Sequence, residues 1–456
     1  FRNRALNPEK PVLHGTAQNP DIFFQAREAS NKYYEATPAI VQKYMDKVNA
    51  EIGTDYKLFN YYGAPDAEQV IIAMGSVCDT IEETIDYMLA QGKKVGLVKV
   101  RLYRPFSVDA FVSAIPETVK KITVLDRTKE PGALGEPLYL DVVAALKQAG
   151  KFQDVPVFTG RYGLGSKDTN PAQIIAVYNN TEKPRFTIGI EDDVTGLSLP
   201  IGENPNTTPE GTTCCKFWGL GSDGTVGANK NSIKIIGDHT DKYAQAYFEY
   251  DTKKSGGITR SHLRFGDKPI RSSYLVTKNA NFVACHNQSY MEKYDIVSEI
   301  KPGGTFLLNC TWTPEELDHH LSAEVKRTIA NNNIHFYTID AIKIGKEIGL
   351  GNKTNAILQS AFFKLANIIP VDDAVTYMKA AIVKSYGKKG EKVVNMNYAA
   401  VDAGLSGLTK IDVPASWKDA KDVDQEAIKK VLPEYVEKLM VPMNALKGDL
   451  LPVSVF

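Results

Sequence analysis

The sequence lacks an excess of charge of either sign. Its 456 residues include 54 basic and 54 acidic side chains, which gives a formal net charge of +0. It also lacks long apolar runs, because the longest, such as residues 70–77, are far shorter than the roughly 20 residues that a membrane-spanning helix needs. A nucleic-acid footprint would require clustered basic charge. We therefore expect neither a nucleic-acid partner nor membrane association.

Cysteine is scarce, with five residues at positions 78, 214, 215, 285 and 310. They form no Cys-x-x-Cys pair and have no metal-ligand spacing, so we assign no metal-binding residue. The adjacent Cys214 and Cys215 are expected to be free or packed thiols rather than a vicinal disulfide. Free, scattered thiols are typical of a reducing compartment, which favours the cytoplasm.

The chain begins at Phe1, without a methionine, and its first residues do not resemble a signal peptide. It ends at Phe456 with no obvious closing helix or strand. Both ends suggest a fragment, or one piece of a nicked polypeptide.

The length predicts two or three domains. Residues 22–49 are helix-like, and Pro38 is expected to break that helix. From about residue 60, apolar strand-like runs alternate with amphipathic segments. The predicted strands are residues 70–74, 95–100, 122–125 and 155–158, and the predicted helices are residues 79–90, 108–115, 134–148 and 171–177. This alternation is typical of a parallel sheet with helices on both faces.

A turn-rich stretch at residues 199–211 separates this alternation from a second one. After about residue 412 the chain is rich in lysine, aspartate and glutamate, and we expect a connecting segment with one helix at 425–439. The sequence therefore predicts an α/β fold of two successive domains, with mainly parallel sheets flanked by helices. The second alternation has predicted strands at residues 247–250, 273–276, 282–285, 305–308 and 335–339, and predicted helices at 314–331, 356–365 and 373–384.

The most informative segment is the glycine-rich loop at residues 219–227, between an apolar run and a helix-like segment at 232–237. Glycine lets the backbone turn tightly and approach a ligand, and a helix start offers free N–H donors, so such a loop suits a phosphate. The loop lacks the Gly-Lys-Ser/Thr ending of a P-loop and is not a clean dinucleotide fingerprint. It is either a phosphate-binding loop or a turn that serves strand–helix packing.

Other polar motifs also leave two interpretations open. Lys253 and Lys254 follow the strand at 247–250, where they either reach the sheet edge that carries the glycine loop or form a solvated face. The loop at 160–168 is either a second anion loop or a rigid contact with a neighbouring domain or subunit. Asn355, before the helix at 356–365, is also a good turn and helix-start residue.

The histidines do not indicate a catalytic group. His262 is expected to be a hydrogen-bonded structural residue. Cys285 and His286 are adjacent on a strand, so their side chains point to opposite faces and are not expected to form a thiolate–imidazole pair. His319 and His320 are expected at the surface, because a helical zinc site would prefer an i, i+4 pair.

In combination, several motifs resemble the pyruvate:ferredoxin (flavodoxin) oxidoreductase family. The chain resembles the central portion of these enzymes. The resemblance covers essentially the whole chain, and several long motifs occur in the same order. The motifs are Arg4-Ala5-Leu6-Asn7-Pro8, Gly15-Thr16-Ala17-Gln18-Asn19-Pro20-Asp21, Gly160-Arg161-Tyr162-Gly163-Leu164, residues 219–231, residues 254–264 and Gln359-Ser360-Ala361-Phe362-Phe363.

This resemblance implies a division into four parts. Residues 1–48 would be the tail of the domain that binds the pyrimidine side of thiamine diphosphate. Residues 49–205 would form a transketolase C-terminal-like domain, and residues 206–412 a Rossmann-like domain that binds coenzyme A, similar to the gamma part of 2-oxoacid oxidoreductases. Residues 413–456 would be the linker toward the iron–sulfur region.

The resemblance also implies the residues that bind coenzyme A. In the family these are the glycine loop, a lysine after the following strand and two asparagines further on. The lysine falls at either of two adjacent positions here. By motif the residues are Asp223, Gly224, Thr225, Val226, Gly227, Lys253 or Lys254, Asn355 and Asn397.

The family's reaction converts pyruvate, coenzyme A and oxidised ferredoxin into acetyl-coenzyme A, carbon dioxide and reduced ferredoxin. It implies thiamine diphosphate, Mg²⁺ and 4Fe–4S clusters, a ferredoxin or flavodoxin partner, and a homodimer. This chain has no Gly-Asp-Gly…Asn motif and no cysteine cluster, so it is expected to bind coenzyme A, to work with the enzyme's other domains and to be inactive alone. We assign no catalytic residue. An organelle of an anaerobic protist, such as a hydrogenosome, is the alternative location.

Two other functions remain open at this point. The chain could be a non-catalytic scaffold subunit that binds coenzyme A or a nucleotide. It could also be a free-standing dehydrogenase, although the acidic residue expected about 20 residues after the glycine loop is missing from the end of the next strand. Asp241 lies before that strand.

Overall fold

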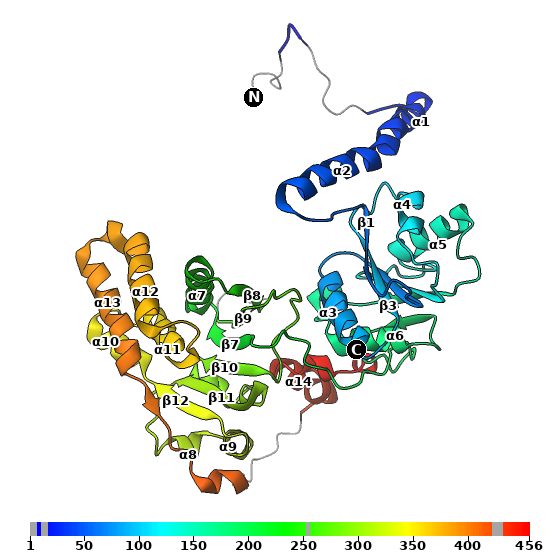
Figure 1. Cartoon of the computed structure of the whole chain (residues 1–456). Coiled ribbons are helices and arrows are strands. Elements are labelled where there is room, and N and C mark those ends of the chain that lie inside the picture. The colour runs from blue at the N-terminus through cyan, green and yellow to red at the C-terminus, as the bar shows by residue number, and fades with distance from the viewer. Residues whose placement is uncertain (1–6, 11–16, 252–255, 422–431) are drawn as a thin grey trace. The chain divides into compact units, whose positions relative to one another are not determined.

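A computed structural model describes residues 7–10, 17–251, 256–421 and 432–456 (Figure 1). By their contacts the residues form two compact units. Unit 1 comprises Phe1–Cys78 and Gly92–Thr159, and unit 2 comprises Asp79–Gln91 and Gly160–Phe456. Within the described ranges, no helix is both long enough and apolar enough to cross a bilayer.

Unit 1 is built on a sheet whose strands lie in the order β1-β3-β2-β4-β5. Strand β2 is parallel to β3 and β4, whereas β1 is antiparallel to β3. Every residue of β4 is buried, as expected for a strand covered on both faces. The predicted strands and helices of this region are confirmed, and β1 is an additional strand. The elements are β1 (Phe59–Gly63), β2 (Gln69–Ala73), β3 (Val95–Val100), α4 (Val108–Ser113), β4 (Lys121–Asp126), α5 (Pro137–Ala149) and β5 (Val157–Arg161).

Two helices, α1 (Pro20–Glu28) and α2 (Asn31–Ile52), precede this sheet. The predicted break at Pro38 is wrong, because Pro38 lies inside α2 and the helices separate at Ala29 and Ser30. Neither helix contains a buried residue, so water can solvate the carbonyl that proline leaves without a donor. The Thr37 hydroxyl also donates to the neighbouring carbonyl of Tyr33 at 2.7 Å. Pro38 is therefore tolerated in an exposed helix.

Unit 2 contains a seven-stranded sheet in the order β13-β12-β11-β10-β7-β9-β8. The four central strands β7, β10, β11 and β12 are parallel, while β9 is antiparallel to both β7 and β8. This confirms the predicted α/β class with mainly parallel sheets. The strands are β7 (Thr213–Leu220), β8 (Tyr243–Tyr250), β9 (Ile258–Gly266), β10 (Ala280–Cys285), β11 (Ile300–Asn309), β12 (His335–Ile339) and β13 (Thr409–Lys410).

One predicted strand in unit 2 is wrong. Residues 273–276 form no strand, because backbone groups in and beside this segment bond to side chains instead of to a neighbouring strand. The Arg264 guanidinium donates to the carbonyls of Ser272 and Tyr274, at 3.0 and 2.5 Å, and the Val276 N–H donates to Nδ1 of His262 at 3.1 Å. The strand in this part of the sheet is β9, which the sequence does not predict because its polar residues interrupt the apolar pattern of a strand.

The helix predicted at 314–331 is two helices, α8 (Leu317–His320) and α9 (Ala323–Asn331). The Ser322 hydroxyl caps α9 by accepting a hydrogen bond from the Val325 N–H at 3.3 Å, so the chain restarts there. The helix predicted at 425–439 lies partly outside the described residues. Its described part contains a π-helical turn at Val436–Met440, followed by α14 (Val441–Asn444).

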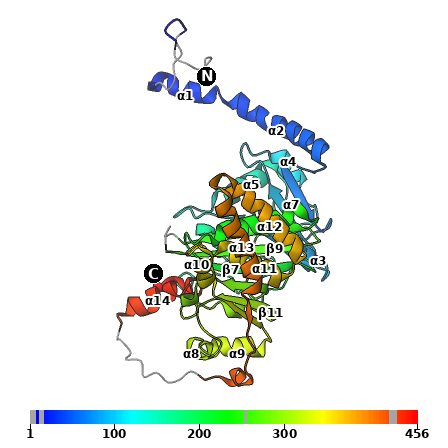
Figure 2. The ribbon, with the colours of Figure 1, turned by 90° about the vertical axis from the view of Figure 1, so that its left-hand side faces the viewer.

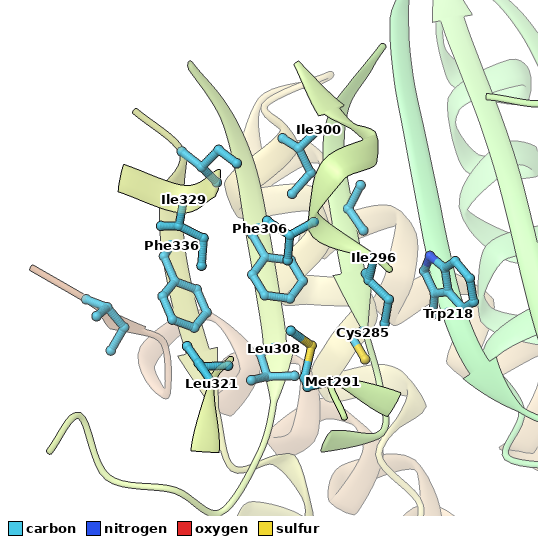
Figure 3. Packing of buried hydrophobic residues seen from close by; sticks show 14 of the residues in the cluster. Trp218, Cys285, Met291, Ile296, Ile300, Phe306, Leu308, Leu321, Ile329 and Phe336 are labelled. Atoms are coloured by element: carbon cyan, nitrogen blue, oxygen red, sulfur yellow. The ribbon is translucent and has the colours of Figure 1, made fainter. Parts of the chain in front are cut away.

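Helices cover both faces of the unit 2 sheet. In Figures 1 and 2, α11, α12 and α13 lie over one face, and the α8–α9 pair lies over the other. Side chains of β7 alternate between the two cores: Phe217 packs with Phe362, and Trp218 belongs to the core that contains Phe306 and Phe336 (Figure 3). The remaining elements of unit 2 are most of α3 (Val77–Leu89), α6 (Pro171–Asn179), β6 (Arg185–Thr187), α7 (Thr225–His239), α10 (Ala341–Ile348), α11 (Asn355–Ala366), α12 (Val371–Tyr386) and α13 (Glu391–Ser406).

Charged side chains are buried on the Trp218 face of this sheet. Lys216 of β7 forms an ion pair with Glu299, and burial lowers the pKa of Lys216. On β9, Arg260 and His262 both contact Glu249 of β8 at 2.7 Å. His262 Nδ1 accepts the Val276 N–H, so the ring's single proton lies on Nε2 and is donated to Glu249. His262 is therefore a neutral structural residue, as predicted.

We expect Gly404→Ala to destabilise unit 2 by about 1–3 kcal/mol. A Cβ at this position of α13 would overlap the Ser360 hydroxyl and the Ile357 carbonyl of α11, so the two helices would have to separate. The measurement is urea unfolding followed by tryptophan fluorescence, because all three tryptophans lie in unit 2. The matched control is Gly237→Ala on the exposed side of α7, where a Cβ would meet nothing within 4 Å. An equal effect of both changes would contradict the packing argument.

Unit 2 should lose stability as the pH falls from about 6.5 toward 4. Burial lowers the pKa of His262 to about 4 in the folded protein, from 6.5, so the unfolded chain binds more protons across this window. The full shift corresponds to about 3 kcal/mol. His262→Gln, which cannot be protonated, should be less stable than the parent at pH 7, with a difference that shrinks toward pH 5. Parallel pH profiles in urea unfolding would refute this; exposed His335→Gln is the control.

Candidate functional site

The glycine-rich loop is a tight turn between a buried strand and a long helix. Strand β7 ends at Leu220 and α7 begins at Thr225. Between them, Ser222 and Gly224 have positive φ angles of 73° and 88°. Glycine adopts this left-handed region readily and serine does not, so the turn contains one strained residue. The predicted strand–loop–helix arrangement is confirmed, but α7 begins at Thr225, before the predicted helix start at 232, so the turn itself is only residues 221–224.

The Asp223 carboxylate closes the turn. Its Oδ2 accepts hydrogen bonds from the Leu220 N–H at 2.8 Å and from the Thr225 hydroxyl at 2.9 Å. Its Oδ1 accepts the Thr225 N–H at 2.7 Å. Both oxygens are thus directed to donors of the loop itself, and the carboxylate caps the first turn of α7.

Thr225 connects this turn to the neighbouring strand. Its Oγ1 lies 2.7 Å from Nδ1 of His286, the first residue after β10. A Cβ at position 219 would lie 2.6 Å from this oxygen, so the close approach requires Gly219. The His286 N–H donates to the Trp218 carbonyl at 2.9 Å, and burial lowers the pKa of the His286 ring to about 4. The loop is therefore held from two adjacent strands.

Asn355, the first residue of α11, lies directly against the loop. A Cβ on Gly224 would overlap its amide nitrogen. The Gln359 amide, one turn further along α11, donates to Asn231 at 2.9 Å and to Ser232 at 3.0 Å, which fastens α11 to α7. Two segments that are about 130 residues apart in sequence, and that sequence reasoning had selected separately, therefore meet at one place.

The start of α7 is suited to an anion. In the part of the chain that the structure describes, the backbone N–H groups of Val226 and Gly227 have no hydrogen-bond partner. Free N–H groups and the positive end of the helix dipole attract negative charge. Gly227 is exposed, and a Cβ there would meet nothing within 4 Å, so this side of the turn is open.

The remaining predicted site residues are placed less directly. Lys253 and Lys254 lie outside the described residues. The Gly257 carbonyl, three residues after Lys254, accepts the Gly221 N–H at 2.6 Å, so the chain after the lysines contacts the loop. Asn397 lies on α13, and its amide donates to the Val393 carbonyl of its own helix at 2.8 Å. Among described residues, no hydrogen bond joins Asn397 to the loop.

Sequence reasoning missed the contact between His286 and the loop, since it considered His286 only with Cys285. The signal was its position directly after the strand predicted at 282–285, in a domain whose sheet is predicted to be mainly parallel. Cys285 does face the opposite core, and burial raises the pKa of its thiol to about 12, so it is no nucleophile. All five cysteines are buried, and none forms a disulfide among the described residues. His319 and His320 are exposed, as predicted.

The loop at 160–168 contacts other residues of unit 2. Lys167 forms an ion pair with Asp449, and Oδ2 of Asp168 accepts the Leu275 N–H at 3.1 Å. Burial raises the pKa of the Asp168 carboxyl, which faces the protein interior. These contacts favour a packing role over an anion loop. Within the described ranges, no group of His, Cys, Asp and Glu side chains could hold a metal ion.

Comparison with known proteins gives a consistent result. A family model described as pyruvate ferredoxin/flavodoxin oxidoreductase matches residues 214–407, and one described as pyruvate:ferredoxin oxidoreductase core domain II matches residues 67–174. The chain is 59% identical to the pyruvate:ferredoxin oxidoreductase of Moorella thermoacetica, over 100% of its own length and 39% of that protein's.

Two further relatives differ in their named electron acceptors. The chain is 56% identical to the pyruvate-flavodoxin oxidoreductase of Enterobacter agglomerans, over 100% of its length and 39% of that protein's. It is 49% identical to the mitochondrial pyruvate dehydrogenase [NADP(+)] of Euglena gracilis, over 99% of its length and 25% of that protein's. The chain thus spans well under half of each relative. These matches show that the chain belongs to the pyruvate:ferredoxin/flavodoxin oxidoreductase family.

Proposed function

We propose that this chain is the central part of a thiamine diphosphate- and iron–sulfur-dependent pyruvate:ferredoxin oxidoreductase, and that unit 2 contributes its coenzyme A site. The observation that carries the proposal is the contact between Asn355 and the turn at Gly224, at the open N-terminus of α7. The complete enzyme would convert pyruvate and coenzyme A to acetyl-coenzyme A and carbon dioxide, and reduce ferredoxin. The names of the relatives support this reaction.

The loop fits the phosphates of coenzyme A. The ligand's negative charge suits the free N–H groups of Val226 and Gly227, and the Asn355 amide and Lys253 or Lys254 would add donors. A carboxylate beside a phosphate would normally repel it, but both oxygens of Asp223 already accept hydrogen bonds from the loop. Asp223 and Thr225 would therefore shape the site, which binds mainly through backbone groups. Asn397 is included by motif alone, because its amide donates to the Val393 carbonyl of its own helix.

Coenzyme A, when bound, supplies the thiol that takes the acetyl group, while thiamine diphosphate and iron–sulfur clusters supply decarboxylation and electron transfer. No residue of this chain is proposed to hold thiamine diphosphate, Mg²⁺ or a 4Fe–4S cluster. The cysteines, which would have to ligate a cluster, are dispersed and individually buried. The residues of unit 2 would bind and orient coenzyme A.

The domain arrangement is part of the proposal. The spans matched by the family models, 67–174 and 214–407, fall inside the proposed transketolase C-terminal-like domain (49–205) and coenzyme A domain (206–412). Residues 1–48 and 413–456 would connect to the thiamine diphosphate and iron–sulfur domains. We further propose a homodimer, a ferredoxin or flavodoxin partner, and a cytoplasmic location or, alternatively, an organelle. The alternative, a non-catalytic scaffold subunit that binds coenzyme A or a nucleotide, is not favoured, because the relatives are named as oxidoreductases.

The 456-residue chain should bind coenzyme A in isothermal titration, dephospho-coenzyme A more weakly, and NAD least. Replacing Lys253 and Lys254 together by alanine should weaken coenzyme A binding about tenfold, because the double change removes the phosphate-binding cation at whichever of the two positions it lies. The affinity of the variant should also depend less on salt concentration. Equal affinity for NAD would count against the coenzyme A site, and an unchanged affinity of the double variant would exclude the lysines.

Asn355→Ala should weaken coenzyme A binding by about five- to tenfold, equivalent to the loss of one hydrogen bond of about 1 kcal/mol. Asn352→Ala is the matched control, because Asn352 is exposed in the same connecting segment and three residues away. Isothermal titration measures both, with tryptophan fluorescence to verify the fold. If the two changes have the same effect, Asn355 does not contact the ligand.

A further inference from the structure

We propose that His286 is a positioning residue for the coenzyme A site, and that His286, Thr225 and Asp223 form one directed hydrogen-bonded chain that holds the phosphate-binding turn in shape. This inference rests on the function proposed above and extends it to a residue outside the predicted set. Among the described residues, His286 forms no hydrogen bond to Asn355 or to the open side of the turn. It would act through Thr225.

The topology places His286 at the ligand-binding edge of the sheet. From β7 the chain first crosses toward β9 and β8, and then returns to the other side, where β10, β11 and β12 follow. The direction of winding therefore reverses between β7 and β10. In doubly wound sheets, ligands bind outside the carboxyl ends of the strands at this reversal. The turn at 221–224 follows β7 there, and His286 follows β10.

The direction of the hydrogen bonds follows from the number of protons. The Asp223 carboxylate only accepts, and it receives the Leu220 N–H, the Thr225 N–H and the Thr225 O–H. A hydroxyl has one proton, so once Thr225 donates to Asp223 its Oγ1 must accept from Nδ1–H of His286, at 2.7 Å. The opposite direction would leave Thr225 Oγ1 and Asp223 Oδ2 as two facing acceptors 2.9 Å apart.

A second observation agrees with this assignment. Nε2 of His286 is buried and has no hydrogen-bond partner among the described residues. The ring is neutral at pH 7, because burial lowers its pKa to about 4, so it has a single N–H. An unpartnered buried nitrogen costs stability, and each such group in a native protein requires an explanation. Here the ring gives its one proton to Thr225.

The His286 backbone and ring are themselves held rigidly. The Asn309 amide donates to the His286 carbonyl at 3.0 Å, and Oδ1 of Asn309 accepts the Ala341 N–H at 3.0 Å. The ring packs edge-on against Phe217, with centroids 6.1 Å apart. The ends of β7, β10 and β11 are therefore connected. The hydrogen-bonded chain of His286, Thr225 and Asp223 keeps the Asp223 charge directed into the turn and away from its open side.

The test compares variants that keep or remove the Nδ1 donor. His286→Asn places an amide N–H near the position of Nδ1–H, whereas His286→Leu removes it; Thr225→Val removes the hydroxyl between the two. We expect coenzyme A affinity to fall about five- to twentyfold in His286→Leu and in Thr225→Val. The double variant should be no weaker than the weaker single one, because both changes break one chain. His286→Asn should recover most of the loss, and exposed His319→Leu should show none.

A ligand-free measurement keeps the proposal testable if a variant fails to fold. Nitrogen-15 spectra of the wild-type chain labelled at histidine report which ring nitrogen carries the proton, and we expect Nδ1–H for His286. An Nε2–H tautomer would overturn the proposal, as would wild-type affinity in His286→Leu or additive losses in the double variant. If the wild-type chain binds no coenzyme A, the proposed function fails, while the spectra still decide the hydrogen-bonded chain.

Discussion

The burial of strand β7 along all but its two end residues is the constraint on which unit 2 depends. Every residue from Cys214 to Gly219 is buried, so side chains must alternate between two separate cores. This alternation sends Phe217 toward the helices α7 and α11, and Lys216 and Trp218 toward the opposite face. A buried lysine requires a partner, and Glu299 both pairs with Lys216 and accepts the indole N–H of Trp218 at 3.3 Å.

The proposed site is a consequence of the same strand. Because β7 lies between β10 and β9, its carboxyl end has His286, which follows β10, on one side and Gly257, which precedes β9, on the other. Small residues then allow close approach: Gly219 admits the Thr225 side chain and Gly224 admits Asn355. The turn is consequently held by packing and hydrogen bonds of the protein itself. A rigid turn with free N–H groups loses little conformational freedom on binding an anion, which favours affinity.

Much of the fold could be predicted from the sequence, because apolar periodicity is a local signal. Strands β3 and β12 and helices α11 and α12 lie close to their predicted positions. The failures share a physical cause. Strand β9 has polar side chains at Arg260, His262 and Arg264. These side chains are compatible with burial only because Glu249, Gln245 and backbone carbonyls accept their hydrogen bonds. Pro38 does not break α2, because the carbonyl that it leaves without a donor lies in an exposed helix and can be solvated.

The sequence by itself determined the class of fold, the family and the strand–turn–helix at residues 219–227, since these depend on local patterns and on motifs in order. Only the tertiary structure decided which of the candidate residues meet. It placed Asn355 on Gly224, and it joined His286 to Thr225 rather than to Cys285, because strand order and helix packing, and not spacing along the chain, bring these groups within hydrogen-bond distance.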